Sequence, residues 1–207
     1  VLTHLIDARQ GKINVLTVED PPEYRIRGAV QTPLLGDKDD PEAVSRGWAR
    51  AISNAMRLDP DVIMVGEMRD LDSAAATFRA GMTGHSVWTT LHANDSISIL
   101  ERLRDLGVEL SLLTDPALVT GLISQVLVRK LCTGCRKPYL SHKASLDADL
   151  IDRIERTCNT EAVYLKGDGC PQCKGTGVGG RTVVAEVVMP TMSLMDAFKS
   201  EGKAGAR

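Results

Sequence analysis

Four of the five cysteines form two Cys-x-x-Cys pairs, Cys132 with Cys135 and Cys170 with Cys173. Two thiolates at this spacing reach one tetrahedral ion, and two such pairs close a four-sulfur shell that leaves no open coordination position. The pattern therefore favours a structural Zn²⁺ site over two redox pairs or a set of buried reduced thiols. Cys158 lies outside both pairs and is expected to be an inert thiol.

Acidic residues follow two short apolar runs of the chain. Residues 14–18 lead into Glu19 and Asp20, and the continuous apolar run 62–65 leads through a glycine into Glu67. Open α/β sheets bind ligands at the carboxyl ends of their strands. An acid at the end of a buried strand is the Walker-B arrangement, in which the carboxylate orients Mg²⁺ or polarises the attacking water. The alternative is a solvated strand end without a catalytic role.

Two histidines, His85 and His92, flank a third run at residues 86–91, which has the pattern of a buried strand. An imidazole at the carboxyl end of that strand could donate a hydrogen bond to a phosphate oxygen. A structural role is the alternative for both residues, and His85 could simply cap the end of the preceding helix.

The elements that must position these residues alternate between helices and strands. A helix is expected at the start of the chain and a loop at residues 36–40, after which Asp40 and Pro41 provide an N-cap and a first-turn proline. Further helices are expected at 73–80, at 96–106 and from 115 to 130, and the strands at 14–18, 62–65 and 86–91. Repeated strand–helix units predict an α/β fold with a parallel sheet. Beyond residue 131 we expect a polar helix at 148–156, a strand at 182–188 and a frayed tail after Lys199.

Composition narrows the function classes. The chain has 207 residues, of which 43% are hydrophobic and 25% charged, and its formal net charge is −2. A protein whose main partner is nucleic acid would carry an excess of Lys and Arg, so direct nucleic-acid binding is not expected. The apolar runs are too short for a transmembrane segment, and no signal peptide is visible. The first residue, Val1, is not a methionine and lies inside a helical pattern, so we expect a fragment of a longer protein.

In their order and spacing, four segments together resemble the motor ATPases of type II secretion and type IV pilus assembly. They correspond to the Asp box, Walker B, His box and tetracysteine arm of that family, at 18–24 (VEDPPEY), 59–70 (DPDVIMVGEMRD), 83–94 (TGHSVWTTLHAN) and 131–135 (LCTGC). The resemblance implies a RecA-like P-loop NTPase core with an inserted zinc-binding tetracysteine arm. Residues 1–131 would belong to the ATPase core, 132–175 to the arm, and 176–207 to a returning strand and helix.

The resemblance also implies roles for individual residues. Glu67 would be the general base for water, and Glu23 would support catalysis. Glu19 and Asp20 would line the Mg²⁺ side of the site, while His85 and His92 would sense the nucleotide. The cofactors of the complete enzyme would be ATP and Mg²⁺, beside the structural Zn²⁺. The complete protein would be a homo-hexamer on the cytoplasmic face of the inner membrane, where it docks onto a membrane platform or cytoplasmic docking protein and powers pilin assembly or protein secretion.

One departure from the family pattern is the absence of its phosphate-binding loop, G-x-x-x-x-G-K-S/T, from the 207 residues. We expect that loop to precede Val1, and we expect the 207-residue stretch alone neither to hydrolyse ATP nor to bind it tightly.

Two other functions compete with this interpretation. Pilus retraction ATPases of the same superfamily resemble the chain as far as His92 but generally lack the cysteine arm. A non-enzymatic zinc module is suggested by residues 170–177 (CPQCKGTG), which resemble one repeat of the zinc finger in DnaJ-type co-chaperones, but that assignment leaves residues 19–94 unexplained.

Overall fold

The computed structural model describes residues 1–34 and 39–206, so most of the loop expected at 36–40 lies outside the described residues. The chain forms two compact units. Unit 1 comprises residues 1–124 and 186–207, and unit 2 comprises residues 125–185. The division into core and arm that the family resemblance implies, with the arm at 132–175, stays a prediction.

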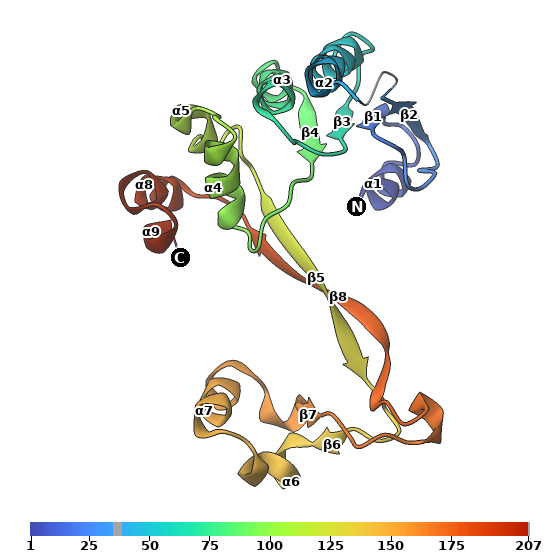
Figure 1. Ribbon diagram of the computed structural model, residues 1–207, viewed down its shortest axis with the longest axis vertical. Helices are drawn as coiled ribbons and strands as arrows, with labels where there is room; N and C mark the ends of the chain where they lie inside the picture. Colours follow the sequence, from blue (N-terminus) through green and yellow to red (C-terminus); the bar gives the residue numbers. More distant parts are fainter. Residues whose placement is uncertain (35–38, 207) are drawn as a thin grey trace. The chain divides into compact units, whose positions relative to one another are not determined.

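A four-stranded parallel sheet forms the centre of unit 1, with the strand order β2-β1-β3-β4 (Figure 1). Its strands are β1 (Val15–Glu19), β2 (Ala29–Pro33), β3 (Val62–Val65) and β4 (Ser86–Thr89). The two central strands are almost fully buried, as their continuous apolar sequences predict. The expectation of a buried strand at 86–91 was wrong, because β4 is an edge strand in which Ser86 and Trp88 are exposed.

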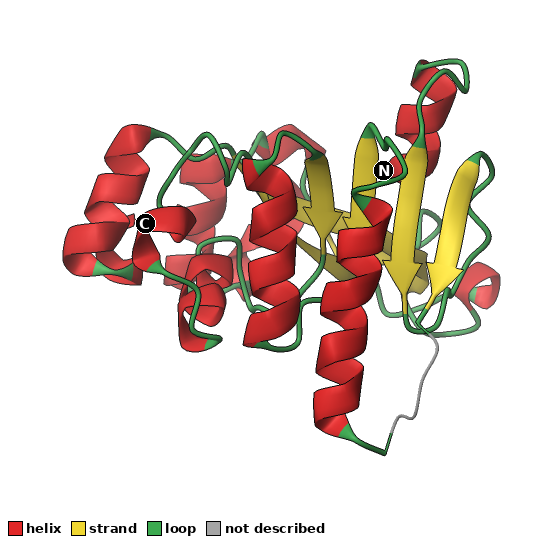
Figure 2. Cartoon of the chain, turned by 90° about the horizontal axis from the view of Figure 1, so that it is seen from above, coloured by secondary structure: helices red, strands yellow, loops and turns green. Residues whose placement is uncertain are grey.

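Helices cover both faces of the sheet, and the strands run side by side between them in Figure 2. The helices of unit 1 are α1 (Leu2–Ala8), α2 (Pro41–Ala55), α3 (Leu71–Met82), α4 (Ser98–Asp105), α5 (Leu110–Leu113), α8 (Met192–Glu201) and α9 (Lys203–Ala206). Side chains alternate along a strand. Leu16 and Ile63 therefore pack with α2 and α3 on one face, whereas Val15 and Val62 pack with α1 on the other.

The predicted start of α2 is confirmed. Asp40 is the N-cap, its carboxylate accepts a hydrogen bond from the Glu42 backbone N–H at 3.0 Å, and Pro41 is the first helical residue. Trp48 and Ile52 then lie at helical spacing and are buried against the sheet. This packing holds α2 against one face of the sheet, over β1 and β3.

The expected helix from 115 to 130 was wrong. Asp115 opens only a turn, in which its backbone carbonyl accepts hydrogen bonds from the Leu118 and Val119 N–H groups. The chain then forms β5 (Leu122–Leu131), which pairs with β8 (Val178–Val188) in a two-stranded sheet (Figure 1). The segment 119–128 is rich in β-branched residues, which lose side-chain freedom in a helix and favour strands. The Asp-Pro helix signal was thus outweighed by the residues that follow it.

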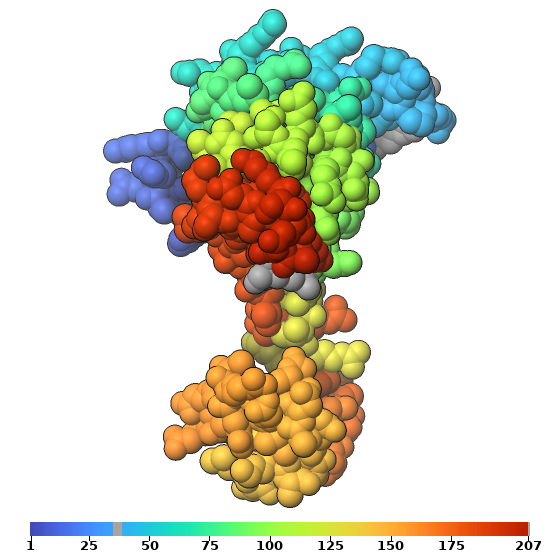
Figure 3. Space-filling view, turned by 90° about the vertical axis from the view of Figure 1, so that its left-hand side faces the viewer, coloured from blue at the N-terminus to red at the C-terminus, as the bar shows by residue number. Residues whose placement is uncertain are grey.

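The frayed tail expected after Lys199 was also wrong. α8 continues to Glu201 and α9 follows it, and Ala206 packs against a buried cluster that contains Phe198 of α8 and Leu100 of α4. In Figure 3 the red C-terminal helices lie directly against the yellow-green segment that contains α4. The Lys203 ammonium lies 2.8 Å from the Asp95 carboxylate, which ties α9 to the start of α4.

Unit 2 contains most of the β5–β8 sheet and a second, antiparallel pair of short strands. Its remaining elements are β6 (Lys137–Pro138), α6 (Tyr139–His142), α7 (Ala148–Thr157), β7 (Tyr164–Leu165) and three 3₁₀ turns at Lys143–Ser145, Thr160–Ala162 and Pro171–Cys173. The polar helix expected at 148–156 is therefore confirmed. Within residues 1–34 and 39–206, no helix combines the length and apolarity that crossing a bilayer requires.

Candidate active site and metal centre

Glu67 lies immediately beyond the carboxyl end of β3, where Gly66 passes very close to β1. The Gly66 N–H donates to the Val18 carbonyl at 2.8 Å. A Cβ atom on Gly66 would lie 3.2 Å from that same oxygen and 3.3 Å from the Glu19 Cα. Only glycine fits here without displacing the backbone of β1. The close approach carries Glu67 to the edge of the sheet at which β1 also ends.

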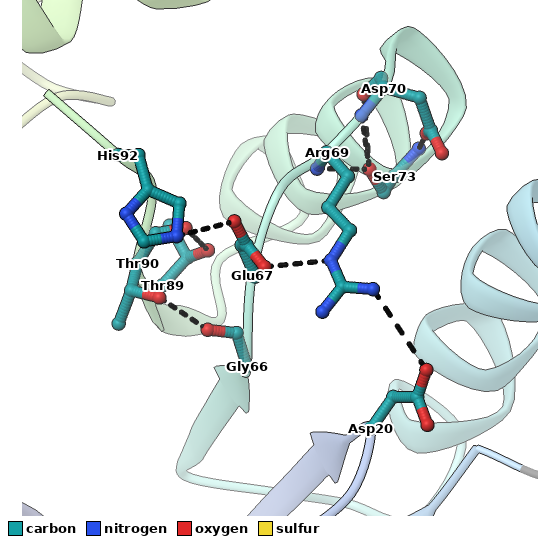
Figure 4. Close-up of polar contacts among 9 residues, drawn as sticks. All are labelled: Asp20, Gly66, Glu67, Arg69, Asp70, Ser73, Thr89, Thr90 and His92. Atoms are coloured by element: carbon teal, nitrogen blue, oxygen red, sulfur yellow. Dashed lines mark hydrogen bonds and ion pairs between the residues drawn. The ribbon is translucent and has the colours of Figure 1, made fainter.

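Polar side chains from three strand ends gather around Glu67 and Arg69 (Figure 4). The Glu67 Oε2 accepts a hydrogen bond from the Arg69 Nε at 2.7 Å, and its Oε1 lies 3.3 Å from the His92 Nε2. Arg69 also approaches Asp20, with 4.0 Å between Nη1 and Oδ2. The His92 side chain is 95% exposed, whereas that of Asp20 is only 8% exposed. The group therefore has a buried side at Asp20 and an open side at His92.

The turn after Glu67 is fixed by the start of α3. Asp70 is the N-cap, and its carboxylate accepts a hydrogen bond from the Ser73 N–H at 2.8 Å. The Ser73 hydroxyl lies 3.3 Å from the backbone N–H groups of both Arg69 and Asp70. This reciprocal capping box holds the backbone of residues 69 and 70 and therefore fixes the position of the Arg69 Cα atom.

Three of the expected site residues lie apart from this group. The Glu19 carboxylate is buried and accepts hydrogen bonds from Thr17 at 2.5 Å and Gln31 at 3.0 Å. Glu23 is exposed in the loop after β1.

His85 precedes β4 and therefore lies at the opposite end of that strand from His92. Its Nδ1 is 3.2 Å from the Ala80 carbonyl of α3 and 3.1 Å from the Thr83 hydroxyl. This is the geometry of the alternative, helix-capping role.

The four paired cysteines of unit 2 gather as their spacing predicts. Their Sγ atoms all lie within 4.8 Å of one another, with 3.7 Å between Cys132 and Cys170 and 3.9 Å between Cys135 and Cys173. Four sulfurs placed about 2.3 Å from one ion at the corners of a tetrahedron lie about 3.8 Å apart. The cluster therefore has the dimensions of a closed four-thiolate site, and no fifth group is needed to complete it. Cys158 is exposed and lies outside the cluster.

Two backbone N–H groups point at the sulfur of Cys173, one of the two buried cysteines of the cluster. Cys173 accepts hydrogen bonds from the Cys170 N–H at 3.1 Å and the Gly177 N–H at 3.2 Å, and these bonds lower the pKa of its thiol to about 6. Burial, together with hydrogen bonds to neighbouring thiols, raises the pKa of Cys135 to about 12. A cation among the four sulfurs would favour the thiolate form of every one of them.

Comparison with known proteins identifies the family. The sequence profile of the Type II/IV secretion system protein family matches residues 2–206. The chain belongs to this family. The type II secretion system ATPase E of Vibrio cholerae is 38% identical over 188 residues, which are 91% of this chain and 35% of that protein. The type II secretion system protein HxcR of Pseudomonas aeruginosa is 41% identical over 174 residues, or 84% of this chain and 31% of that protein. The chain thus spans about a third of these secretion family relatives.

Two solved structures share the fold of this family member. A structure of the pilus retraction motor PilT with bound ADP matches with a TM-score of 0.58 at 24% identity, over 96% of this chain and 45% of that chain. The ATPase DotB of Legionella pneumophila matches with a TM-score of 0.56 at 21% identity, over 99% of this chain and 44% of that chain. At such identities the likeness establishes the α/β fold alone.

We call Asp20, Glu67, Arg69 and His92 the strand-end group. Arg69 of this group, and Thr90 beside it, were not identified from the sequence as site residues of this family member. Arg69 belongs to the Walker-B-like segment, and its position two residues after Glu67 is the signal that could have identified it. Thr90 follows β4, and its hydroxyl donates to the Gly66 carbonyl at 2.5 Å. Nothing in the sequence around Thr90 indicated this contact, because the contact depends on the register in which β3 and β4 pair.

Proposed function

We propose that the chain is part of a hexameric ATPase whose ATP hydrolysis powers pilin or pseudopilin assembly, or protein secretion, across the bacterial envelope. The observation that carries the proposal is the Glu67 carboxylate, held at the carboxyl end of a central parallel strand between Arg69 and His92. The proposal is supported by membership of the secretion family and by 38% identity to a relative described as a secretion ATPase. Four cysteines and this identity favour assembly or secretion over pilus retraction.

In the proposed reaction Glu67 accepts the proton of the attacking water. Arg69 occupies Oε2, which leaves Oε1 as the oxygen that takes the proton. His92 is 95% exposed, so its imidazole can turn from Glu67 towards a phosphate oxygen. Asp20, whose side chain is buried, lies on the far side of Arg69 from the carboxylate, and it is the acid we assign to the Mg²⁺ side. When bound, Mg²⁺ would supply the positive charge that offsets the phosphates.

We further propose that Cys132, Cys135, Cys170 and Cys173 hold one structural Zn²⁺. Sulfur is a preferred zinc ligand, and the separations of 3.7 Å between Cys132 and Cys170 and 3.9 Å between Cys135 and Cys173 are close to the edge length of a tetrahedral zinc–sulfur shell. A closed shell leaves no position for water, so the ion would order unit 2 rather than take part in hydrolysis. The proposed partners of the complete protein are its own copies in the hexamer and an inner-membrane platform or docking protein, with the complex on the cytoplasmic side of that membrane.

The decisive variant is Glu67→Gln in the protein at its full natural length. Glutamine keeps the shape of the side chain and a hydrogen-bonding oxygen but cannot take the proton, so ATP turnover should fall by about 10² or more while Mg-ATP still binds. Glu42→Gln is the matched control, because Glu42 is exposed and its carboxylate pairs with the surface Arg46 of its own helix. Turnover would be measured by phosphate release and binding by calorimetry. Near-normal turnover in Glu67→Gln would refute the proposed function.

A further inference from the structure

Thr90, the first residue after β4, contacts the backbone on both sides of Glu67. Its hydroxyl donates to the Gly66 carbonyl at 2.5 Å, and its carbonyl accepts a hydrogen bond from the Met68 N–H at 3.0 Å. Gly66 and Met68 are the two neighbours of Glu67 in the chain. The backbone on both sides of Glu67 is therefore held by a single residue at the exit of the adjacent strand. Figure 4 shows the contact with Gly66.

Thr90 also fixes the position of the backbone that leads to His92. Two residues after Thr90, the His92 Nε2 lies 3.3 Å from the Glu67 Oε1. The His92 side chain is 95% exposed, so little packing holds its ring, and its position depends on the backbone that leads to it. The register between residues 66–68 and Thr90 thus determines how the carboxylate and the imidazole face each other.

We propose that Thr90 is a positioning residue whose hydroxyl keeps Glu67 and His92 in register for attack by water. The inference rests on the proposed function, in which Glu67 is the base. The two contacts of Thr90 can be tested separately by substitution, because one uses its hydroxyl and the other its backbone carbonyl. The bond from the Met68 N–H uses the Thr90 backbone and survives any substitution that keeps the backbone conformation, whereas the bond to the Gly66 carbonyl needs the hydroxyl. Displacement of a reacting group by about 1 Å can cost up to about 10²-fold in rate, so loss of this one bond is expected to slow hydrolysis.

The test compares four variants of the protein at its full natural length, with Mg-ATP as substrate. Thr90→Val keeps the shape and removes the hydroxyl, and Thr90→Ala repeats the loss in a smaller side chain in case valine prevents folding. We expect kcat to fall about 10-fold with the KM for Mg-ATP nearly unchanged. Thr90→Ser should restore most of kcat because it retains the donor. Thr157→Val is the matched control, since the exposed Thr157 hydroxyl donates to the Arg153 carbonyl of its own helix, in unit 2, at 2.7 Å.

A second measurement asks whether Thr90 acts through Glu67. When Thr90→Val is added to Glu67→Gln, the residual turnover should not fall further, because the base that Thr90 positions is already absent. Hydrogen exchange at the Met68 amide should stay protected in both Thr90→Ser and Thr90→Val, because that bond uses only the Thr90 backbone, and this protection would show that the variant has kept its backbone conformation. Unchanged kcat in Thr90→Val and Thr90→Ala, or a full 10-fold loss in the Glu67→Gln background, would overturn the inference. Turnover that persists in Glu67→Gln would instead refute the proposed function itself.

Discussion

The strand-end group of unit 1 and the cysteine cluster of unit 2 are assembled in different ways. Each cysteine pair is local in sequence, and the two pairs close on each other with sulfur separations that leave the cluster enclosed. The strand-end group draws Asp20, Glu67 and His92 from three separate strands and stays open on the His92 side. An enclosed set of soft ligands suits a permanent structural ion, whereas an open set of charges suits a ligand that enters, reacts and leaves.

The support behind each site differs as well. Around the cysteines, the hydrogen bonds to Cys173 come from backbone N–H groups within four residues of it. Around Glu67, the supporting bonds connect different strands: Gly66 to Val18 of β1, and Gly66 to Thr90 after β4. Damage to the first site should therefore act mainly on local folding, and damage to the second mainly on the alignment of the sheet.

The largest effect is expected from Cys173→Ser. Structural zinc binding is worth about 10–16 kcal/mol in small zinc domains, so loss of one ligand should remove the ion and unfold the surrounding loops. Elemental analysis should find about one zinc per chain in the wild type and little in the variant, with faster hydrogen exchange confined to residues 125–185. Cys158→Ser, which removes the exposed fifth thiol, should retain full zinc content. Rapid exchange spreading through the sheet of unit 1 would contradict the contrast between the two sites.

A smaller effect is expected from Gly66→Ala. The new Cβ would press on the Val18 carbonyl and the Glu19 Cα, and overpacking of this kind costs about 1–3 kcal/mol. Calorimetry should find a lower melting temperature for unit 1, and ATP turnover of the full-length protein should fall with it.

Gly81→Ala is the matched control for that substitution. Gly81 lies in α3, and a Cβ there meets no atom within 4 Å, so alanine should stabilise by roughly 0.5–1 kcal/mol through helix propensity. Equal destabilisation by both substitutions would mean that the close approach at Gly66 has no special role.

The smallest effect is expected from Tyr139→Phe, which tests whether unit 2 has a core apart from the cysteines. Tyr139 is fully buried and its hydroxyl lies 3.1 Å from the Glu155 carboxylate. Burial, with the nearby Glu155, raises the pKa of Tyr139 above its ordinary value. The wild type should therefore lose this contribution only as the pH rises above the ordinary tyrosine range and through the raised pKa, whereas Tyr139→Phe should lack that loss.

At neutral pH, loss of the hydrogen bond should lower the melting temperature of zinc-loaded unit 2 by roughly 5 °C. Tyr24→Phe, at a side chain in unit 1 that is 78% exposed, should change nothing. Ultraviolet titration of tyrosinate would follow the ionisation. If Tyr139→Phe removed a tyrosinate component from the ordinary tyrosine range, and not from above it, the hydroxyl would not be sequestered.

The sequence predicted the parallel α/β fold, the start of α2, the two central strands and the cysteine cluster. Each of these rests on a short, strong pattern, such as Asp40-Pro41 or paired Cys-x-x-Cys. It failed for residues 115–130, where one helix-start signal competed with a β-branched run that pairs with a strand almost 50 residues further along the chain. It also failed for the tail, because the partner that orders Lys203 is Asp95, 108 residues away.

For the two sites, the sequence by itself determined which residues could do chemistry: four thiols at metal-binding spacing, an acid after a buried strand and a histidine after the next. Only the tertiary structure decided which of them meet. It brought Glu67 into contact with Arg69 and His92. It placed Glu19 elsewhere, hydrogen-bonded to Thr17 and Gln31. His85 lies at the other end of β4, against the end of α3. The physical reason is that side-chain direction and strand register depend on partners distant in sequence. The spacing of two cysteines, by contrast, is fixed by the local chain.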